Sequence, residues 1–323
     1  MPDKFAFSGE LFAFCTTLCW SIGIFPFTEA ARRLGPNSVN HFRILLAVLL
    51  LSVICFFFLP YNINSFFSQT LNEHWLWFGL SGIVGLAFGD YFGFTAFAIL
   101  GTRIGSVFTT LSPAAALLLG YFLIHEKINL IGILGILITI GGVIWISFSK
   151  SQTSTLKDYG LGSIRKGIIF AILASLCQGF GIVLANKGLE YKVNGEDLNA
   201  IHATWLRMVC ACAGMYLVTV TRGKFFTVIR PVLENKNKGN WLAVAGTILG
   251  PVAGVIFSMY AISLLKDKPS VAQTIFSLVP VFVLPLAYLI YKERITWKGV
   301  LGAVIAIAGV IILILREEIL KLF

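Results

Sequence analysis

The sequence predicts an all-α polytopic membrane protein, on the strength of its apolar content, its few charges and the length of its apolar blocks. Of the 323 residues, 57% are hydrophobic and only 12% are charged, and the mean hydropathy is +0.87. A soluble domain carries about 25% charged residues. A soluble enzyme, a disordered chain and a peripheral basic protein are therefore excluded. An outer-membrane barrel is excluded as well, because its strands alternate over about ten residues instead of running apolar for about twenty.

Ten apolar blocks are long enough to be membrane spans, since a helix needs roughly 20 mostly apolar residues to cross a hydrocarbon core of about 30 Å. In chain order the blocks cover about 11–30, 44–60, 75–98, 104–124, 128–148, 168–186, 206–221, 241–264, 271–291 and 295–315. The longest gaps between blocks are too short to hold a folded soluble domain.

The ends of these blocks carry the residues expected at a membrane surface. Lys and Arg lie mainly in the gaps, where they anchor and orient helices, so the net charge of +10 does not indicate nucleic-acid binding. Six of the seven tryptophans mark block ends and fit an interfacial belt. In chain order they are Trp75, Trp77, Trp145, Trp205, Trp241 and Trp297.

The chain repeats itself, with an offset that grows from 158 residues to 167. The closing unit is clearest, because six positions recur at the constant offset of 167: Pro113, Glu126, Ile128, Gly132, Gly135 and Gly142 match Pro280, Glu293, Ile295, Gly299, Gly302 and Gly309. Five helices are therefore duplicated, as residues 10–147 and 166–315. An odd number of spans inverts the second copy, and inverted repeats are typical of secondary transporters whose site lies between the repeats near the midplane.

The closing units, Ser112-Pro113 to His125-Glu126-Lys127-Ile128 with the glycines that follow, resemble the EamA-type module of the drug/metabolite transporter superfamily. Two tandem modules cover nearly the whole chain. The resemblance implies ten helices as two inverted five-helix repeats around a central cavity, with the fifth and tenth spans packed outside it. It also implies transport of small polar metabolites such as amino acids or drug-like compounds, and a place in the plasma or inner membrane.

Two arguments on orientation disagree. The odd-numbered gaps hold sixteen of the 25 Lys and Arg residues, so the positive-inside rule places both termini outside. The family resemblance implies cytoplasmic termini, and we follow the resemblance.

No motif for catalysis, metal or cofactor binding occurs in the sequence. There is no ATP-binding P-loop and no Ser/His/Asp or paired-carboxylate grouping at catalytic spacing. The cysteines lie in or beside apolar blocks, without a second Cys or His pair to complete a metal site. The sequence thus predicts no enzyme, no cofactor and no metal. The energy for transport must come from an ion or substrate gradient, or the protein is a facilitator.

Asp90 is the one carboxylate well inside an apolar block. An ionisable side chain at that depth costs at least about 2.5–3.5 kcal/mol, and by default it marks a pathway, a relay or an ion partner. The alternative is an Asp held by backbone groups or by an Arg solely to pack helices. The second repeat has Val255 at the equivalent position, so the two halves are not functionally equivalent.

Arg43 and Arg207 are matched at an offset of 164, each opening the second span of its repeat. One interpretation makes them interfacial anchors, although inversion places them on opposite faces and the positive-inside rule then explains only one. The other makes them a pair of guanidinium groups that enter a central cavity from both ends and bind a carboxylate or phosphate.

Further candidates for the substrate site are polar or aromatic residues within the spans. Trp20 and Gln178 are a matched pair in the first spans, either core filling or cavity wall. The remaining binding candidates are Thr109, Tyr260 and Gln273. Four prolines that interrupt helices are candidates for kinks or gates: Pro26, Pro113, Pro251 and Pro280.

The function that these features favour is secondary transport of a small polar organic metabolite by alternating access. Two alternatives remain open: a translocator of a lipid-linked substrate, and a membrane scaffold or receptor without transport. The expected partners are a small-molecule metabolite and membrane lipids, and no nucleic acid. The sequence leaves open whether the chain also forms a homodimer.

Overall fold

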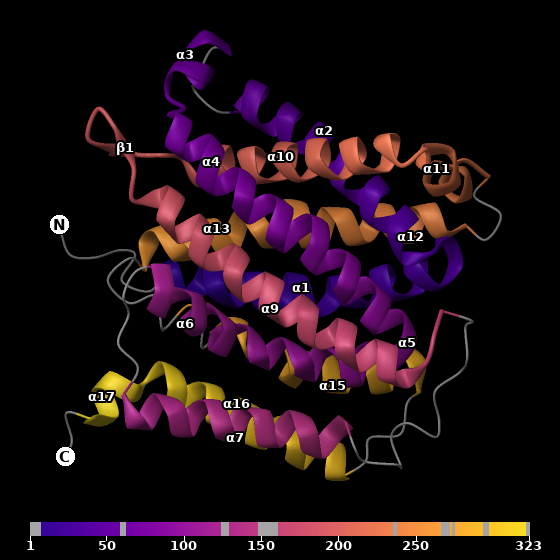
Figure 1. The fold of residues 1–323 in the computed structure, drawn as a ribbon, viewed down its shortest axis with the longest axis vertical. Helices are drawn as coiled ribbons and strands as arrows, with labels where there is room; N and C mark the ends of the chain where they lie inside the picture. Colours follow the sequence, from indigo (N-terminus) through magenta and orange to yellow (C-terminus); the bar gives the residue numbers. More distant parts are fainter. Residues whose placement is uncertain are drawn as a thin grey trace.

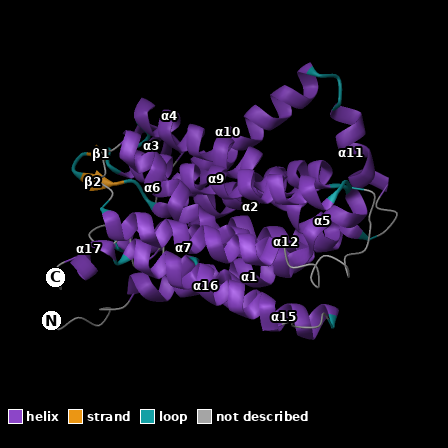
Figure 2. Ribbon diagram, turned by 60° about the horizontal axis from the view of Figure 1, so that its bottom comes forward, coloured by secondary structure: helices purple, strands orange, loops and turns teal. Residues whose placement is uncertain are grey.

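A computed structural model describes residues 8–58, 63–123, 129–147, 161–234, 238–265, 272, 275–292 and 297–320. Nearly all of these residues are helical, and the helices run roughly parallel or antiparallel to one another (Figures 1 and 2). The start of α1 (Ser8–Leu34) and the last described helix, α17 (Arg316–Leu320), lie toward the chain termini, at the end of the molecule that carries the hairpin of β1 (Lys192–Val193) and β2 (Glu196–Asp197). The helix α11 (Phe225–Glu234) lies at the opposite end (Figure 1).

The first half of the described chain consists of long helices and short connecting turns. Its elements are α1 (Ser8–Leu34), α2 (Pro36–Phe58), α3 (Ile63–Ser68), α4 (Asn72–Ser81), the π-helix η1 (Gly82–Gly89), α5 (Asp90–Phe108), the 3₁₀-helix η2 (Thr109–Leu111), α6 (Ser112–Leu123) and α7 (Leu130–Ser147). The residues from Asn72 to Leu123 are helical throughout except at Gly101, whose φ of 77° lies in the left-handed region that glycine adopts without strain. The chain turns there and returns along α6 (Figure 1).

The second half has the same sequence of long helices, with a hairpin after the first. Its elements are α9 (Ile164–Leu189), β1 (Lys192–Val193), β2 (Glu196–Asp197), α10 (Ala200–Thr221), α11 (Phe225–Glu234), α12 (Gly239–Thr247), the π-helix η3 (Ile248–Gly254), α13 (Val255–Leu264), α15 (Val279–Tyr291), α16 (Trp297–Ile314) and α17 (Arg316–Leu320). β1 and β2 are antiparallel, with Lys192 opposite Asp197. Side-chain caps begin two of the helices: Ser163 accepts from the Lys166 N–H and Asn199 from the Ile201 N–H.

Within the described residues, six helical stretches are long and apolar enough to cross a membrane. They are Ser8–Leu34, Pro36–Phe57, Asn72–Leu123, Ile164–Leu189, Ala200–Thr221 and Gly239–Leu264. Shorter apolar helices cover Leu130–Trp145, Val279–Tyr291 and Trp297–Leu313. The chain is therefore an all-α, multi-pass membrane protein.

Helices α7 and α16 form a separate pair along one edge of the molecule (Figure 1). Small residues allow their backbones to touch: a Cβ added to Gly142 would lie 2.5 Å from the Ala306 nitrogen, and one added to Gly135 would lie 2.6 Å from the Leu313 nitrogen. The Thr139 hydroxyl donates within α7 to the Gly135 carbonyl at 2.9 Å and across the contact to the Ala306 carbonyl at 3.4 Å. In a lipid bilayer, apolar side chains gain little free energy by leaving the acyl chains for a contact between helices. Helices there commonly associate through small residues that let their backbones approach closely.

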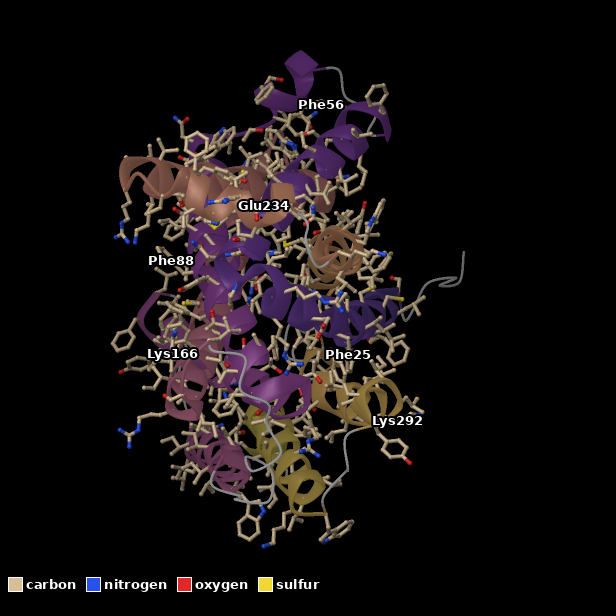
Figure 3. The ribbon with its side chains drawn as sticks, turned by 90° about the vertical axis from the view of Figure 1, so that its right-hand side faces the viewer. Phe25, Phe56, Phe88, Lys166, Glu234 and Lys292 are labelled. Atoms are coloured by element: carbon tan, nitrogen blue, oxygen red, sulfur yellow. The ribbon has the colours of Figure 1, made fainter. Side chains whose placement is uncertain are left out.

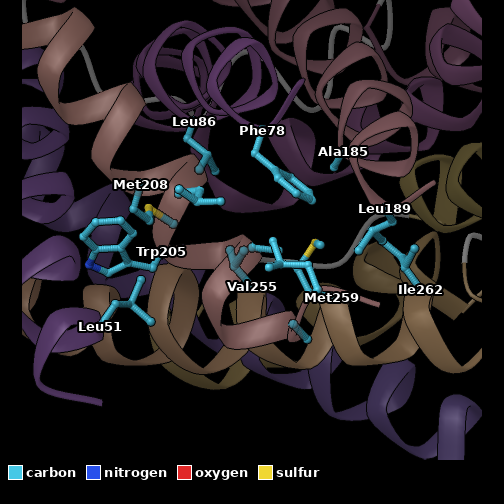
Figure 4. Packing of buried hydrophobic residues seen from close by; sticks show 14 of the residues in the cluster. Leu51, Phe78, Leu86, Ala185, Leu189, Trp205, Met208, Val255, Met259 and Ile262 are labelled. Carbon is cyan, nitrogen blue, oxygen red and sulfur yellow. The ribbon is translucent and has the colours of Figure 1, made fainter. Parts of the chain in front are cut away.

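The largest cluster of buried apolar side chains, which we name the large apolar cluster, joins α1, α2, α4, α9, α10 and α13. Members drawn in Figure 4 include Leu51, Phe78, Leu189, Trp205, Met208, Met259 and Ile262. Trp205 is anchored within it because its indole N–H donates to the Ser52 hydroxyl at 2.8 Å. This cluster fills the half of the helix bundle nearer the chain termini.

Candidate functional site

A cavity of about 200 Å³ lies between the two halves of the chain. Its walls come from α1, η1 and α5 of the first half and from α9, η3 and α15 of the second. Aromatic rings and small apolar side chains make up most of the lining. The polar lining residues are Trp20, Arg43, Asp90, Thr109, Ser112, Ser175, Gln178 and Ser277.

The cavity and the large apolar cluster occupy consecutive stretches of the same helices. On α9 the lining runs from Ala171 to Ile182, and the cluster follows at Ala185 and Leu189. On α13, Val255 belongs both to the lining and to the cluster, and Met259 one turn later belongs to the cluster without lining the cavity. The cluster thus closes the bundle toward the chain termini. The cavity lies on the side of the opposite end, from which Figure 3 shows the helices nearly end-on.

Trp20 and Gln178, the matched pair of the first spans, stand at equivalent places in the two walls. Trp20 packs where η3 meets α13, since a Cβ at Gly254 would lie 2.6 Å from its indole nitrogen. Gln178 packs where η1 meets α5, since a Cβ at Gly89 would lie 3.4 Å from its amide nitrogen. Each residue therefore meets the π-helix of the other half, and glycine at that junction makes the room. π-Helical turns are often found at functional sites.

Asp90 begins α5 at the centre of the cavity wall, and both of its carboxylate oxygens accept hydrogen bonds. The Gln178 amide donates to one oxygen at 2.8 Å, and the Arg43 guanidinium forms an ion pair with the other. Gln178 also donates to the Gly85 carbonyl at 3.2 Å, which ties α9 to η1. Asp90 thus links a residue of the first half to a residue of the second.

Arg43 is almost completely buried, with 1% of its surface exposed. Besides Asp90, its guanidinium donates to the Leu86 carbonyl at 2.7 Å and to the Asn40 side-chain oxygen at 3.0 Å. It also lies 5.1 Å from the centroid of the Phe94 ring, within range of a cation–π contact. Arg43 is therefore held on several sides, and its charge is balanced by Asp90.

Arg207 has different surroundings although it matches Arg43 in the repeat. It is 6% exposed and does not line the cavity, and it lies between Leu206 and Met208 of the large apolar cluster. Its guanidinium donates to the Met259 sulfur at 3.6 Å, while its Nε has no hydrogen-bond partner. In the described part of the chain it forms no ion pair, although it interacts electrostatically with Asp90.

The other predicted residues divide between the cavity and its surroundings. Thr109 lines the cavity and donates to the Ser106 carbonyl, and Pro113 and Pro251 also line it. Tyr260 does not line the cavity and instead stacks on Phe12, with ring centroids 5.2 Å apart.

The two remaining prolines do not line the cavity, and one binding candidate cannot be placed. Pro280 is buried at the start of α15, and Pro26 lies half-buried inside α1. Gln273 lies outside the described residues.

Sequence reasoning missed several lining residues, chiefly Ser175, Ser277 and the rings of Phe27, Phe94, Phe97 and Phe276. A helical spacing signal exists for two of them. Phe94 is four residues after Asp90, and Ser175 is three residues before Gln178, so each shares a helix face with a predicted residue.

Comparison with known proteins is consistent with this arrangement. A family model described as the EamA-like transporter family matches residues 7–148 and again 165–315. The uncharacterized transporter YxxF of Bacillus subtilis (strain 168) is 26% identical over 238 residues, which cover 72% of this chain and 68% of the relative.

A solved structure titled "Crystal structure of protein" has the same fold. Its TM-score is 0.57 at 16% identity, over 97% of this chain and 99% of that one. Because the family model matches twice and together covers most of the sequence, the chain belongs to the EamA-like transporter family.

Proposed function

We propose that the protein is a secondary transporter of a small polar organic metabolite that works by alternating access. The observation that carries this proposal is a cavity between the two halves, sealed toward the chain termini by the large apolar cluster. A transporter needs such a site at the repeat interface, reached from one side at a time.

The proposal includes ten spans arranged as two inverted repeats, residues 10–147 and 166–315, with both termini in the cytoplasm as the family resemblance implies. Equivalent contacts support the duplication. The third span of each repeat contains a π-helix, η1 or η3, and each crosses the first helix of the other half at a pair of glycines. Gly85 meets Gly181 in one crossing, and Gly250 meets Gly23 in the other. The positions in these pairs are related by offsets of 165 and 158 residues.

The lining of the cavity supports an organic substrate with a polar group. Phe27, Phe94 and Phe276 offer apolar surface, while the side-chain oxygens of Gln178 and Asp90 offer hydrogen-bond acceptors. Ligand sites commonly combine a mostly apolar wall with a few placed polar groups.

Counterflow in proteoliposomes tests this function. Vesicles are loaded with one unlabelled compound from a panel of amino acids, nucleosides and sugar phosphates, and uptake of the same labelled compound is measured. We expect accumulation for at least one class. Absence of flux for every class, with folded protein in the vesicles, would contradict transport.

Two substitutions on α9 provide a matched comparison. Ala174 lines the cavity, whereas Ile172 is 39% exposed on the outer surface. Ala174→Trp should fill the cavity and abolish flux, and Ile172→Trp should leave it unchanged. Equal flux in both variants would place the substrate path elsewhere.

A further inference from the structure

Two buried arginines, Arg43 and Arg207, accompany the partly buried carboxylate of Asp90, and their charges do not cancel. Arg43 and Arg207 occupy equivalent positions of the two repeats, but only the first repeat supplies a carboxylate, because Val255 stands opposite Asp90. Among the described residues, Asp90 forms an ion pair with Arg43 and none with Arg207. One carboxylate thus serves a site that has two repeat-related guanidinium groups.

The two arginines differ in what surrounds them. Arg43 lines the cavity, and the α2 residues that follow it, Ile44, Ala47 and Leu51, belong to the large apolar cluster. Arg207 already lies among cluster residues, beside Met259 and close to Gly85 of η1. The ion pair therefore sits on the cavity side, and the guanidinium without a carboxylate sits on the sealed side.

A buried guanidinium without a counter-charge is costly in a medium of low dielectric constant. Arg207 has one weak sulfur acceptor and an Nε without a partner, so within the described residues this conformation gives its guanidinium no ion-pair partner. Such a group is stabilised in any conformation that brings a carboxylate to it. Asp90 is the carboxylate in the cavity wall.

We propose that Asp90 changes its ion-pair partner from Arg43 to Arg207 when the protein closes at the cavity side and opens toward the chain termini. This inference rests on the proposed alternating access, in which inverted repeats exchange their conformations. After the exchange, Arg207 would take the place that Arg43 has now. The second repeat has no carboxylate equivalent to Asp90, so Asp90 itself would have to pair with Arg207. Asp90 and Arg207 are then positioning residues that set which side is open.

The π-helical segment directly before Asp90 gives this carboxylate a means to move. Residues Gly82–Gly89 lie next to Arg207 on α10 and next to Gln178 on α9. Shifting a π-helical turn changes the register of the residues that follow it without breaking the helix. A small shift there would carry Asp90 away from Arg43 and toward Arg207.

Hydrogen–deuterium exchange on the full-length protein in nanodiscs tests the proposal without a known substrate. Arg43→Gln removes the partner that Asp90 has on the cavity side. We expect exchange in Ala200–Met208 to rise at least about tenfold and exchange in Ala171–Gln178 to fall, a population shift within the usual range of coupled equilibria. Both changes should disappear when Arg207→Gln or Asp90→Asn is added.

Arg43→Lys serves as a second variant if Arg43→Gln does not purify as a folded protein, and it should give the same pattern with a smaller amplitude. Arg207→Gln in the wild-type background should leave the wild-type pattern unchanged. The proposal is overturned if Arg43→Gln keeps the wild-type pattern, or loses protection on both sides alike. It is also overturned if the shift persists in the Arg43→Gln/Arg207→Gln protein.

These outcomes separate the partner exchange from transport itself. Flux in the vesicle assay, together with a hydrogen–deuterium exchange pattern that does not depend on Arg207, would refute the change of ion-pair partner and support transport. Absence of flux for every compound, together with the same hydrogen–deuterium exchange pattern in all variants, would refute alternating access.

Discussion

Removal of the Asp90 carboxylate should destabilise the protein, and removal of Arg43 as well should restore part of the loss. In Asp90→Leu, the Arg43 guanidinium stays at 1% exposure and keeps only the Leu86 and Asn40 oxygens as acceptors. Breaking a buried pair by deleting one partner costs about 3–5 kcal/mol, because the other charge is left uncompensated. Replacing both members with apolar residues of similar size is often neutral.

The expected order of stability is therefore wild type close to Asp90→Leu/Arg43→Met, with Asp90→Leu lowest. Asp90→Asn should fall between them, because the amide oxygen still accepts a hydrogen bond but carries no charge. Thermal unfolding in detergent, followed by tryptophan fluorescence, gives the melting temperatures of the four proteins. A double variant no more stable than Asp90→Leu would refute the view that the uncompensated Arg43 charge causes the loss, as would an Asp90→Leu protein as stable as wild type.

Three further predictions follow from single contacts. Gly142→Leu should separate α7 from α16 and lower the melting temperature, whereas Gly141→Leu should not, because no atom lies within 4 Å of a Cβ at Gly141; equal effects would show that the helix pair does not need close approach. Gln178→Leu removes the charge-assisted hydrogen bond from the Gln178 amide to Asp90, which contributes about 1.5–3 kcal/mol, and should reduce counterflow at least about tenfold. Unchanged flux would show that Gln178 only packs against its neighbours. Trp205→Phe loses the hydrogen bond to Ser52 and should cost about 0.5–1.5 kcal/mol in unfolding free energy, with no effect on flux.

Much of the fold follows from local physics that the sequence displays directly. A backbone in hydrocarbon must satisfy its own hydrogen bonds, so apolar blocks of about twenty residues become helices. The predicted break between about 98 and 104 falls at Gly101, where the left-handed backbone requires glycine. The repeated glycines of the fifth and tenth spans, among them Gly142 and Gly309, mediate the contact of α7 with α16.

The candidate site was predictable only in part, because spacing identifies residues on a helix but not what the helix faces. Of the candidates taken from the sequence, Trp20, Asp90 and Gln178 line the cavity, whereas Tyr260 stacks on Phe12 outside it. A tyrosine in the middle of a span can either line a cavity or pack against another helix. Which of the two Tyr260 does depends on how α13 is rotated against α1.

The sequence by itself determined that the chain is a duplicated set of membrane helices with one deep carboxylate and two equivalent arginines. Only the tertiary structure decided which arginine that carboxylate binds. An offset of 164 residues makes Arg43 and Arg207 equivalent positions of the repeat. The packing of η1 between α2, α9 and α10 then brings Asp90 against Arg43 and leaves Arg207 in the large apolar cluster. The physical reason is that an ion pair depends on the distance between side chains from three helices, which no single helix fixes.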